Sequence, residues 1–182
     1  MDMDKIIEFS KSKLPEYFIE NHIKVVVQEA KWLASFYPDS DKEVVEAGAW
    51  LHDVGHIFSE EEKRPKKNEQ LQYHHIRSVD LAQELFKKMD IEDEKVDKIV
   101  HCIESHRTSK PPEPETIEAK IVASADNLSH FVKFEFLSGM LGVEYSIKKI
   151  ERDLGAEFML PEATKKAKSL LEEIKKKYEV EP

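Results

Sequence analysis

The sequence predicts an all-α protein, and three of its features support this. Only five of the 182 residues are glycine, and 36% are charged. Apolar residues recur at three- and four-residue intervals in several segments, which is the spacing of one face of a helix. Alternating β-branched segments, typical of strands, are scarce. We therefore expect residues 1–182 to form a single domain of about seven helices, large enough to bury one hydrophobic core.

The N-terminal part of the chain predicts three helices. The first covers roughly residues 3–12. The second runs from about residue 15 or 21 to residue 36 and carries an apolar stripe. The third follows a capping residue, Ser40 or Asp41, and covers about residues 42–53. Its sequence, EVVEAGAWLHD, is largely apolar, so we expect this helix at the centre of the core.

The rest of the chain predicts further helices between two loops. Residues 59–72 are polar and charged, and residues 108–115 hold three prolines, so both indicate loops. Helices are expected, in chain order, over about 74–89, 93–106, 116–137, 143–150 and 161–178. The part from about 143 to 180 forms a C-terminal helical extension.

Composition excludes several classes of function. The formal net charge of −9 argues against a nucleic-acid polymer held by charge alone. The single cysteine excludes an intramolecular disulfide and a CxxC zinc site, and it fits a reducing compartment. No apolar run approaches the ~20 residues that span a bilayer, and the N-terminus lacks a signal-peptide pattern. We therefore expect a cytoplasmic protein that binds neither membranes nor nucleic-acid polymers.

The histidines indicate a shared site. All eight lie between His22 and His130. His52 and Asp53 stand at the end of the apolar helix, just before Gly55, where a fraying helix end lets both side chains reach one ion. Imidazole and carboxylate together suit Mn, Co, Ni, Zn or Fe better than Ca.

Two further side chains could complete the metal site. His22 and Asp126 each border the apolar stripe of their own helix, where an unpaired carboxylate would be unfavourable. Together with His52 and Asp53 they would provide four ligands from three helices. Such a site leaves positions open for water and substrate, as catalysis requires.

At these positions the chain resembles the HD superfamily of metal-dependent phosphohydrolases. The matching order is His22, His52-Asp53 and Asp126, and the segments AGAWLHDVGH, HHIRSVDLA and PETIEAKIVASADNL look like the family's segments around them. The resemblance implies a single HD-domain helical bundle with its core over about 20–135. This chain departs from the family at SADNL, where many members have a DADRLD-like sequence. The nucleotide preference of those members is therefore not inferred for this chain.

The resemblance implies hydrolysis of a phosphate ester or anhydride in a small phosphorylated metabolite or nucleotide. Asp53 would bind the metal and orient the attacking water. His56, His74 or His106 would stabilise developing charge or protonate the leaving group. Because only neutral imidazole binds metal, activity is expected to fall as the pH drops through the histidine range.

The number of metal ions stays open, with one divalent transition metal favoured and two possible. In HD proteins with two metals, histidines of two later helices bind the second ion. The family spacing to Ser78 favours His74 over His75. On a helical wheel His106 falls near the apolar face and His101 nearly opposite it, which favours His106.

Several residues have a functional and a plainer interpretation. Lys66, in the basic run EEKRPKKNE, belongs either to a solvated loop or to a lid over an anionic substrate. Arg77 and Lys133 are further candidates for phosphate contacts. His56 either contacts phosphate or lies in solvent, and His130 is expected to be a packed structural residue.

Two alternatives to the hydrolase remain. Some HD-fold proteins are di-iron oxygenases, and the same histidines and aspartates would supply enough ligands. The chain could also be a metal-stabilised regulatory module without turnover. In that case the C-terminal extension could bind a partner or form a homodimer interface.

Overall fold

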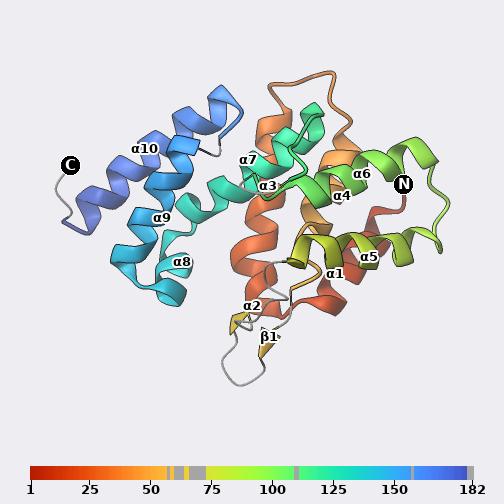
Figure 1. The fold of residues 1–182 in the computed structure, drawn as a ribbon, viewed down its shortest axis with the longest axis horizontal. Helices are drawn as coiled ribbons and strands as arrows, with labels where there is room; N and C mark the ends of the chain where they lie inside the picture. Colours follow the sequence, from red (N-terminus) through yellow and green to blue (C-terminus); the bar gives the residue numbers. More distant parts are fainter. Residues whose placement is uncertain (57, 60–63, 66–72, 109–110, 157, 180–182) are drawn as a thin grey trace.

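The protein is all-α, as the computed structural model shows for residues 1–56, 58–59, 64–65, 73–108, 111–156 and 158–179 (Figure 1). The N-terminal elements are α1 (Met3–Lys13), α2 (Glu16–Phe18), the π-helix η1 (Ile19–Ile23), α3 (Lys24–Ala34) and α4 (Lys42–Leu51). They are followed by α5 (His74–Phe86), α6 (Asp93–Ser105) and α7 (Ile117–Val132). The last three are α8 (Phe134–Leu141), α9 (Val143–Ala156) and α10 (Pro161–Lys177).

The structure divides two of the expected helices. The helix expected up to residue 36 consists of α2, η1 and α3, because its backbone widens into a π-helix at Ile19–Ile23. The helix expected over 116–137 breaks at Lys133, whose φ of −115° and ψ of 48° are not helical, and continues as α8. The helix expected over 143–150 extends to Ala156.

Local signals explain where other helices begin. The Asp41 side chain accepts hydrogen bonds from the backbone N–H groups of Glu43 and Val44, so Asp41 rather than Ser40 caps α4. Within the segment expected as a loop, β1 (Phe58–Ser59) pairs antiparallel with β2 (Arg64–Pro65). This correction is small, because each strand has two residues.

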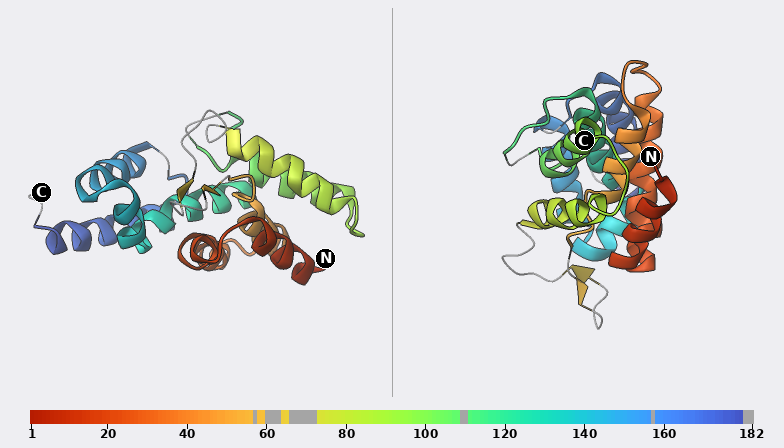
Figure 2. Two further views of the ribbon diagram at one scale, coloured as in Figure 1. Left: turned by 90° about the horizontal axis from the view of Figure 1, so that it is seen from below. Right: turned by 90° about the vertical axis from the view of Figure 1, so that its right-hand side faces the viewer.

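The core has two parts, and α7 belongs to both. Its N-terminal portion packs with α3, α4 and α6 around apolar side chains such as Ile99, Ile121 and Val122. Its C-terminal portion contacts α9 and α10, where Leu128 and Phe131 join a second apolar cluster. In Figure 2 (left) α7 runs between the N-terminal helices and α8–α10. The C-terminal extension thus packs directly on the helix that carries Asp126.

None of the helices within the described ranges is long and apolar enough to cross a membrane.

Candidate metal centre

The four predicted metal ligands meet in the structure. His22 comes from η1, His52 caps the C-terminus of α4, Asp53 follows it, and Asp126 lies on α7. His22 Nε2 lies 3.1 Å from Asp53 Oδ2 and 3.3 Å from His52 Nε2. Asp126 Oδ1 lies 3.4 Å from His22 Nε2 and 3.7 Å from His52 Nε2. An ion bound tetrahedrally at about 2.1 Å separates its ligand atoms by about 3.4 Å, which is close to these distances. His22, His52 and Asp53 form one group that could hold a metal ion, and His22 and Asp126 form another together with His130.

Hydrogen bonds orient two of these imidazoles. His52 Nδ1 donates to the carbonyl oxygen of Ala49 at 2.8 Å. Ser129 Oγ donates to the carbonyl oxygen of Asp126 at 2.7 Å and can therefore accept from His22 Nδ1, 3.2 Å away. With the proton fixed on Nδ1, each ring turns its Nε2 lone pair toward the cluster, as a metal ligand must.

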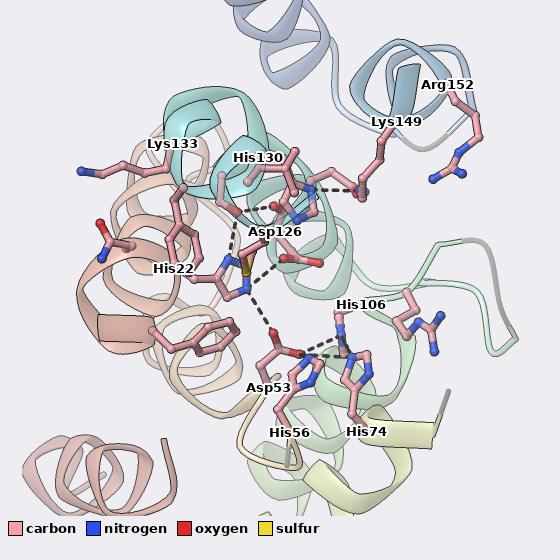
Figure 3. Close-up of a pocket in the computed structure, with 18 residues that line it drawn as sticks. His22, Asp53, His56, His74, His106, Asp126, His130, Lys133, Lys149 and Arg152 are labelled. Carbon is pink, nitrogen blue, oxygen red and sulfur yellow. Dashed lines mark hydrogen bonds and ion pairs between the residues drawn. The ribbon is translucent and has the colours of Figure 1, made fainter. Parts of the chain in front are cut away.

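The other oxygen of Asp53 faces a second group of imidazoles (Figure 3). Asp53 Oδ1 lies 3.2 Å from His56 Nε2, 3.2 Å from His74 Nε2 and 3.5 Å from His106 Nε2. The Nε2 atoms of His74 and His106 are 3.1 Å apart, and His106 Nδ1 donates to the carbonyl oxygen of Ile103 at 2.6 Å. Asp53 Oδ1 is buried and has no hydrogen-bond partner among the described residues. A cation among these atoms would satisfy it.

Gly55 brings the second group of imidazoles up to Asp53. Its backbone N–H donates to Ser78 Oγ at 2.8 Å. A Cβ atom at Gly55 would lie 2.3 Å from the carbonyl oxygen of His74 and 2.6 Å from the backbone nitrogen of Ser78. Only glycine allows the first turn of α5 to come this close to the chain that follows Asp53.

Burial and neighbouring charges shift the pKa values of the cluster. Burial alone would raise the pKa of Asp53, but the surrounding imidazoles, His56 foremost, hold it well below its usual range. Burial lowers the pKa of His56 and of His106, so both rings favour the neutral form that binds metal. Burial also works to lower the pKa of His22, but the bond to Asp53 and the charge of Asp126 outweigh it and raise the pKa. The two carboxylates thus attract positive charge to this point.

Several predicted residues lie elsewhere. His75 is buried but does not line the cavity at the cluster. His101 pairs with Glu104 at 3.2 Å and also lies outside the cavity. Arg77 is exposed on α5 and is not among the lining residues, so its expected contact with substrate phosphate is not supported. Lys66 lies outside the described residues.

A cavity of about 310 Å³ opens beside the cluster. Lys133 lines it, as expected, although in Figure 3 the side chain extends away from the carboxylates. Sequence reasoning missed the other polar side chains of its wall, which are Asn21, Arg107, Asn127, Ser129, Lys149 and Arg152. No local pattern marked them, because they converge only through helix packing.

His130 also lines the cavity, where a packed structural residue was expected. Its ring stacks on that of His22, with the centroids 6.1 Å apart and 15° between the planes. Burial, aided by the charge of Lys149, holds the pKa of His130 well below its ordinary value. His130 is therefore neutral and forms part of the cavity wall next to a predicted metal ligand.

Comparison with known proteins gives one family match. A family model described as HD domain matches residues 19–130, which include all the imidazole and carboxylate groups of the cluster. The chain is also 33% identical over 141 residues to a tRNA (cytidine(56)-2'-O)-methyltransferase of Picrophilus torridus. That match covers 70% of this chain and 36% of the relative, so the chain spans about a third of the relative's length. No solved structure matches.

Proposed function

The chain belongs to the HD domain family, and from this premise we propose that it is a metal-dependent phosphohydrolase. One observation carries the proposal. Asp53, buried and ionised, turns one oxygen toward His22 and His52 and the other toward His56, His74 and His106. An open cavity adjoins both groups, so a substrate can reach them.

We propose that this arrangement holds two divalent transition-metal ions, where the sequence favoured one. His22, His52, Asp53 and Asp126 would bind the first, and Asp53, His56, His74 and His106 the second. When bound, such ions lower the pKa of a water molecule and polarise a phosphoryl oxygen. On this proposal the last three histidines are metal ligands and not proton donors.

The chain's own residues prepare the reaction. Asp53 links the two groups of ligands and would orient the attacking water between them. In the reaction the water oxygen bonds to phosphorus while the phosphorus–oxygen bond to the leaving group breaks, and the water's proton ends on the leaving oxygen. Phe18, whose ring lies 4.8 Å from that of His22 between centroids, gives this end of the cavity an apolar wall.

We propose a small phosphorylated metabolite or nucleotide as the substrate. The cavity of about 310 Å³ fits a molecule of that size. The relative from Picrophilus torridus is named for a reaction on tRNA, which supports a nucleotide among the candidate substrates.

The experiment is a metal analysis combined with a substrate panel. The purified protein, supplied with Mn²⁺, Co²⁺, Ni²⁺ or Zn²⁺, is expected to release phosphate from at least one phosphorylated metabolite or nucleotide. Asp53→Asn should lose metal and lower turnover at least 100-fold, because both groups of ligands lose their shared carboxylate. Asp97→Asn, at an exposed position on α6, is the matched control and should change neither the metal content nor the turnover.

Two results would contradict the proposal. Two irons per chain with consumption of O₂ would favour the di-iron oxygenase, which the position of Asp53 between two ligand groups also suits. No turnover with any metal, together with unchanged metal content in Asp53→Asn, would favour a module without catalysis.

A further inference from the structure

The cavity extends beyond the family's part of the chain. The family model ends at residue 130, but α8 and α9 supply one wall of the cavity. The apolar residues of this wall are Phe136, Leu137 and Met140, and the cations of this wall are Lys149 and Arg152. Figure 3 shows Lys149 reaching toward His130, at the side of the cavity away from His56 and His74.

A buried carboxylate holds both cations. The side chain of Asp153 is fully buried. Its Oδ2 accepts from Lys149 Nζ at 2.5 Å, and its Oδ1 accepts from Arg152 Nη2 at 2.7 Å and from Arg152 Nε at 3.1 Å. Burying a charged group for packing alone is unfavourable, and an apolar residue would serve stability equally well. The arrangement is better explained by the need to fix the two cations.

Lys149 retains hydrogen-bonding capacity for a ligand. Its ammonium group has three N–H donors. Among the described residues, two of these donors form hydrogen bonds, one to Asp153 Oδ2 and one to His130 Nδ1 at 3.3 Å. The third can bind an anion in the cavity that Lys149 lines.

The two ends of the cavity attract different parts of one ligand. Lys149, Arg152 and Asp153 together carry a net charge of +1, in a chain whose net charge is −9. Lys149 contacts His130, whose ring stacks on His22, so one side chain separates the ammonium from the first ligand group. It lies at the His130 side of the cavity, away from His56 and His74 of the second ligand group. The apolar residues of α8 lie in the same cavity wall.

We propose that Lys149 and Arg152 bind a second anionic group of the substrate, so that preferred substrates carry two anionic groups, as nucleoside bisphosphates and sugar bisphosphates do. This inference rests on the proposed function for the identity of the reacting end. Asp153 is a positioning residue, because it acts through the two cations.

The test compares matched ligands on the full chain. Calorimetry measures the binding of adenosine 3',5'-bisphosphate against AMP, and of fructose 1,6-bisphosphate against fructose 6-phosphate. At least one bisphosphate should bind about tenfold more tightly than its monophosphate, and the double variant K149M/R152M should abolish that difference. Lys148→Met is the matched control, since Lys148 lies on the same helix, is 70% exposed and pairs with Glu144. It should leave the preference unchanged.

Asp153→Asn tests the positioning role of Asp153 through KM and kcat, which would not separate if Asp153 only stabilised the fold. It should raise KM for the preferred bisphosphate and leave kcat unchanged, with the melting temperature followed in parallel. If Asp153→Asn fails to fold, the double variant decides the question, because its two side chains line the cavity.

The outcomes separate this inference from the proposed function. Equal affinity within both ligand pairs overturns the inference, as does a preference that survives in K149M/R152M. An equal fall in kcat on mono- and bisphosphates in K149M/R152M also overturns it, because the cations would then act on the reacting group. If the bisphosphate preference is present and lost as expected but no metal supports turnover, the binding site stands and the hydrolase proposal fails.

Discussion

At the scale of single residues, Ser129 links two of the proposed metal ligands. Its hydroxyl donates to the backbone of Asp126 and accepts from His22 Nδ1. Ser129→Ala should therefore weaken metal binding about 10–100-fold, as is usual when a partner of a ligating histidine is lost. The measurement is a metal titration with chelator competition.

Ser35→Ala is the control for this prediction. Ser35 Oγ donates to the carbonyl three residues earlier, as Ser129 Oγ does, but Ser35 is exposed and far from the cluster. Its variant should bind metal as the unaltered protein does. Unchanged affinity in Ser129→Ala would show that packing alone orients His22.

The candidate ligands and their gathering in one place were predicted from the sequence, but the position of Asp53 between two groups of side chains was not. His22 and Asp126 stood out because polar residues at the edge of an apolar stripe need partners. The bridging position of Asp53 depends on which way each carboxylate oxygen points, and no spacing in the sequence encodes that. The place of His56 beside Asp53 Oδ1 follows from the turn at Gly55 and needed the structure.

At the scale of elements, the contact between Gly55 and the first turn of α5 sets the second ligand group. Gly55→Ala should push α5 away, since the new Cβ would overlap the backbone of His74 and Ser78. We expect a loss of stability of about 2–4 kcal/mol and a loss of metal from the group with His74 and His106. Denaturant unfolding and metal content measure the two effects.

Gly139→Ala is the matched control. Gly139 lies within α8, and a Cβ there would meet nothing within 4 Å. This change should raise stability by about 0.5–1 kcal/mol, because alanine favours a helix over glycine. Equal effects of the two substitutions would show that the close approach at Gly55 does not matter.

The π-helix η1 shows why the boundaries of elements were harder to predict than the fold class. Apolar spacing predicted a helix through Ile23 and Val26, and the chain is helical there. The wider turn at Ile19–Ile23 changes the register of that helix where His22 joins the cluster. Such turns recur at functional sites, but no residue pattern announced this one.

At the scale of the whole molecule, the C-terminal extension was predicted as helices, but its role was not. The helix α9, whose residues reach the cavity, packs on α8, α10 and α7. Tyr37 also links α10 to the N-terminal helices, donating to Glu162 Oε2 at 2.7 Å. Contacts over such sequence distances are invisible to local periodicity.

The ion pair between Lys166 on α10 and Glu29 on α3 is expected to stabilise the contact between the C-terminal extension and the N-terminal helices. Glu29 has a 4% exposed side chain, and its Oε2 accepts from Lys166 Nζ at 2.6 Å. Lys166→Met would leave the Glu29 carboxylate buried without this partner, which should reduce the free energy of unfolding by about 1–3 kcal/mol. Because α10 packs on α9, the variant should also weaken the bisphosphate preference assigned to Lys149 and Arg152.

Lys168→Met, at an exposed position of the same helix, is the control and should change unfolding by less than about 0.5 kcal/mol. The double variant Glu29→Gln with Lys166→Met should recover part of the lost stability, because the unpaired charge is removed. Denaturant unfolding and calorimetry on these variants decide the point. Lys166→Met could be destabilised and still keep the full preference for bisphosphates. In that case α9 holds Lys149 and Arg152 in place without α10, and α10 does not contribute to substrate binding.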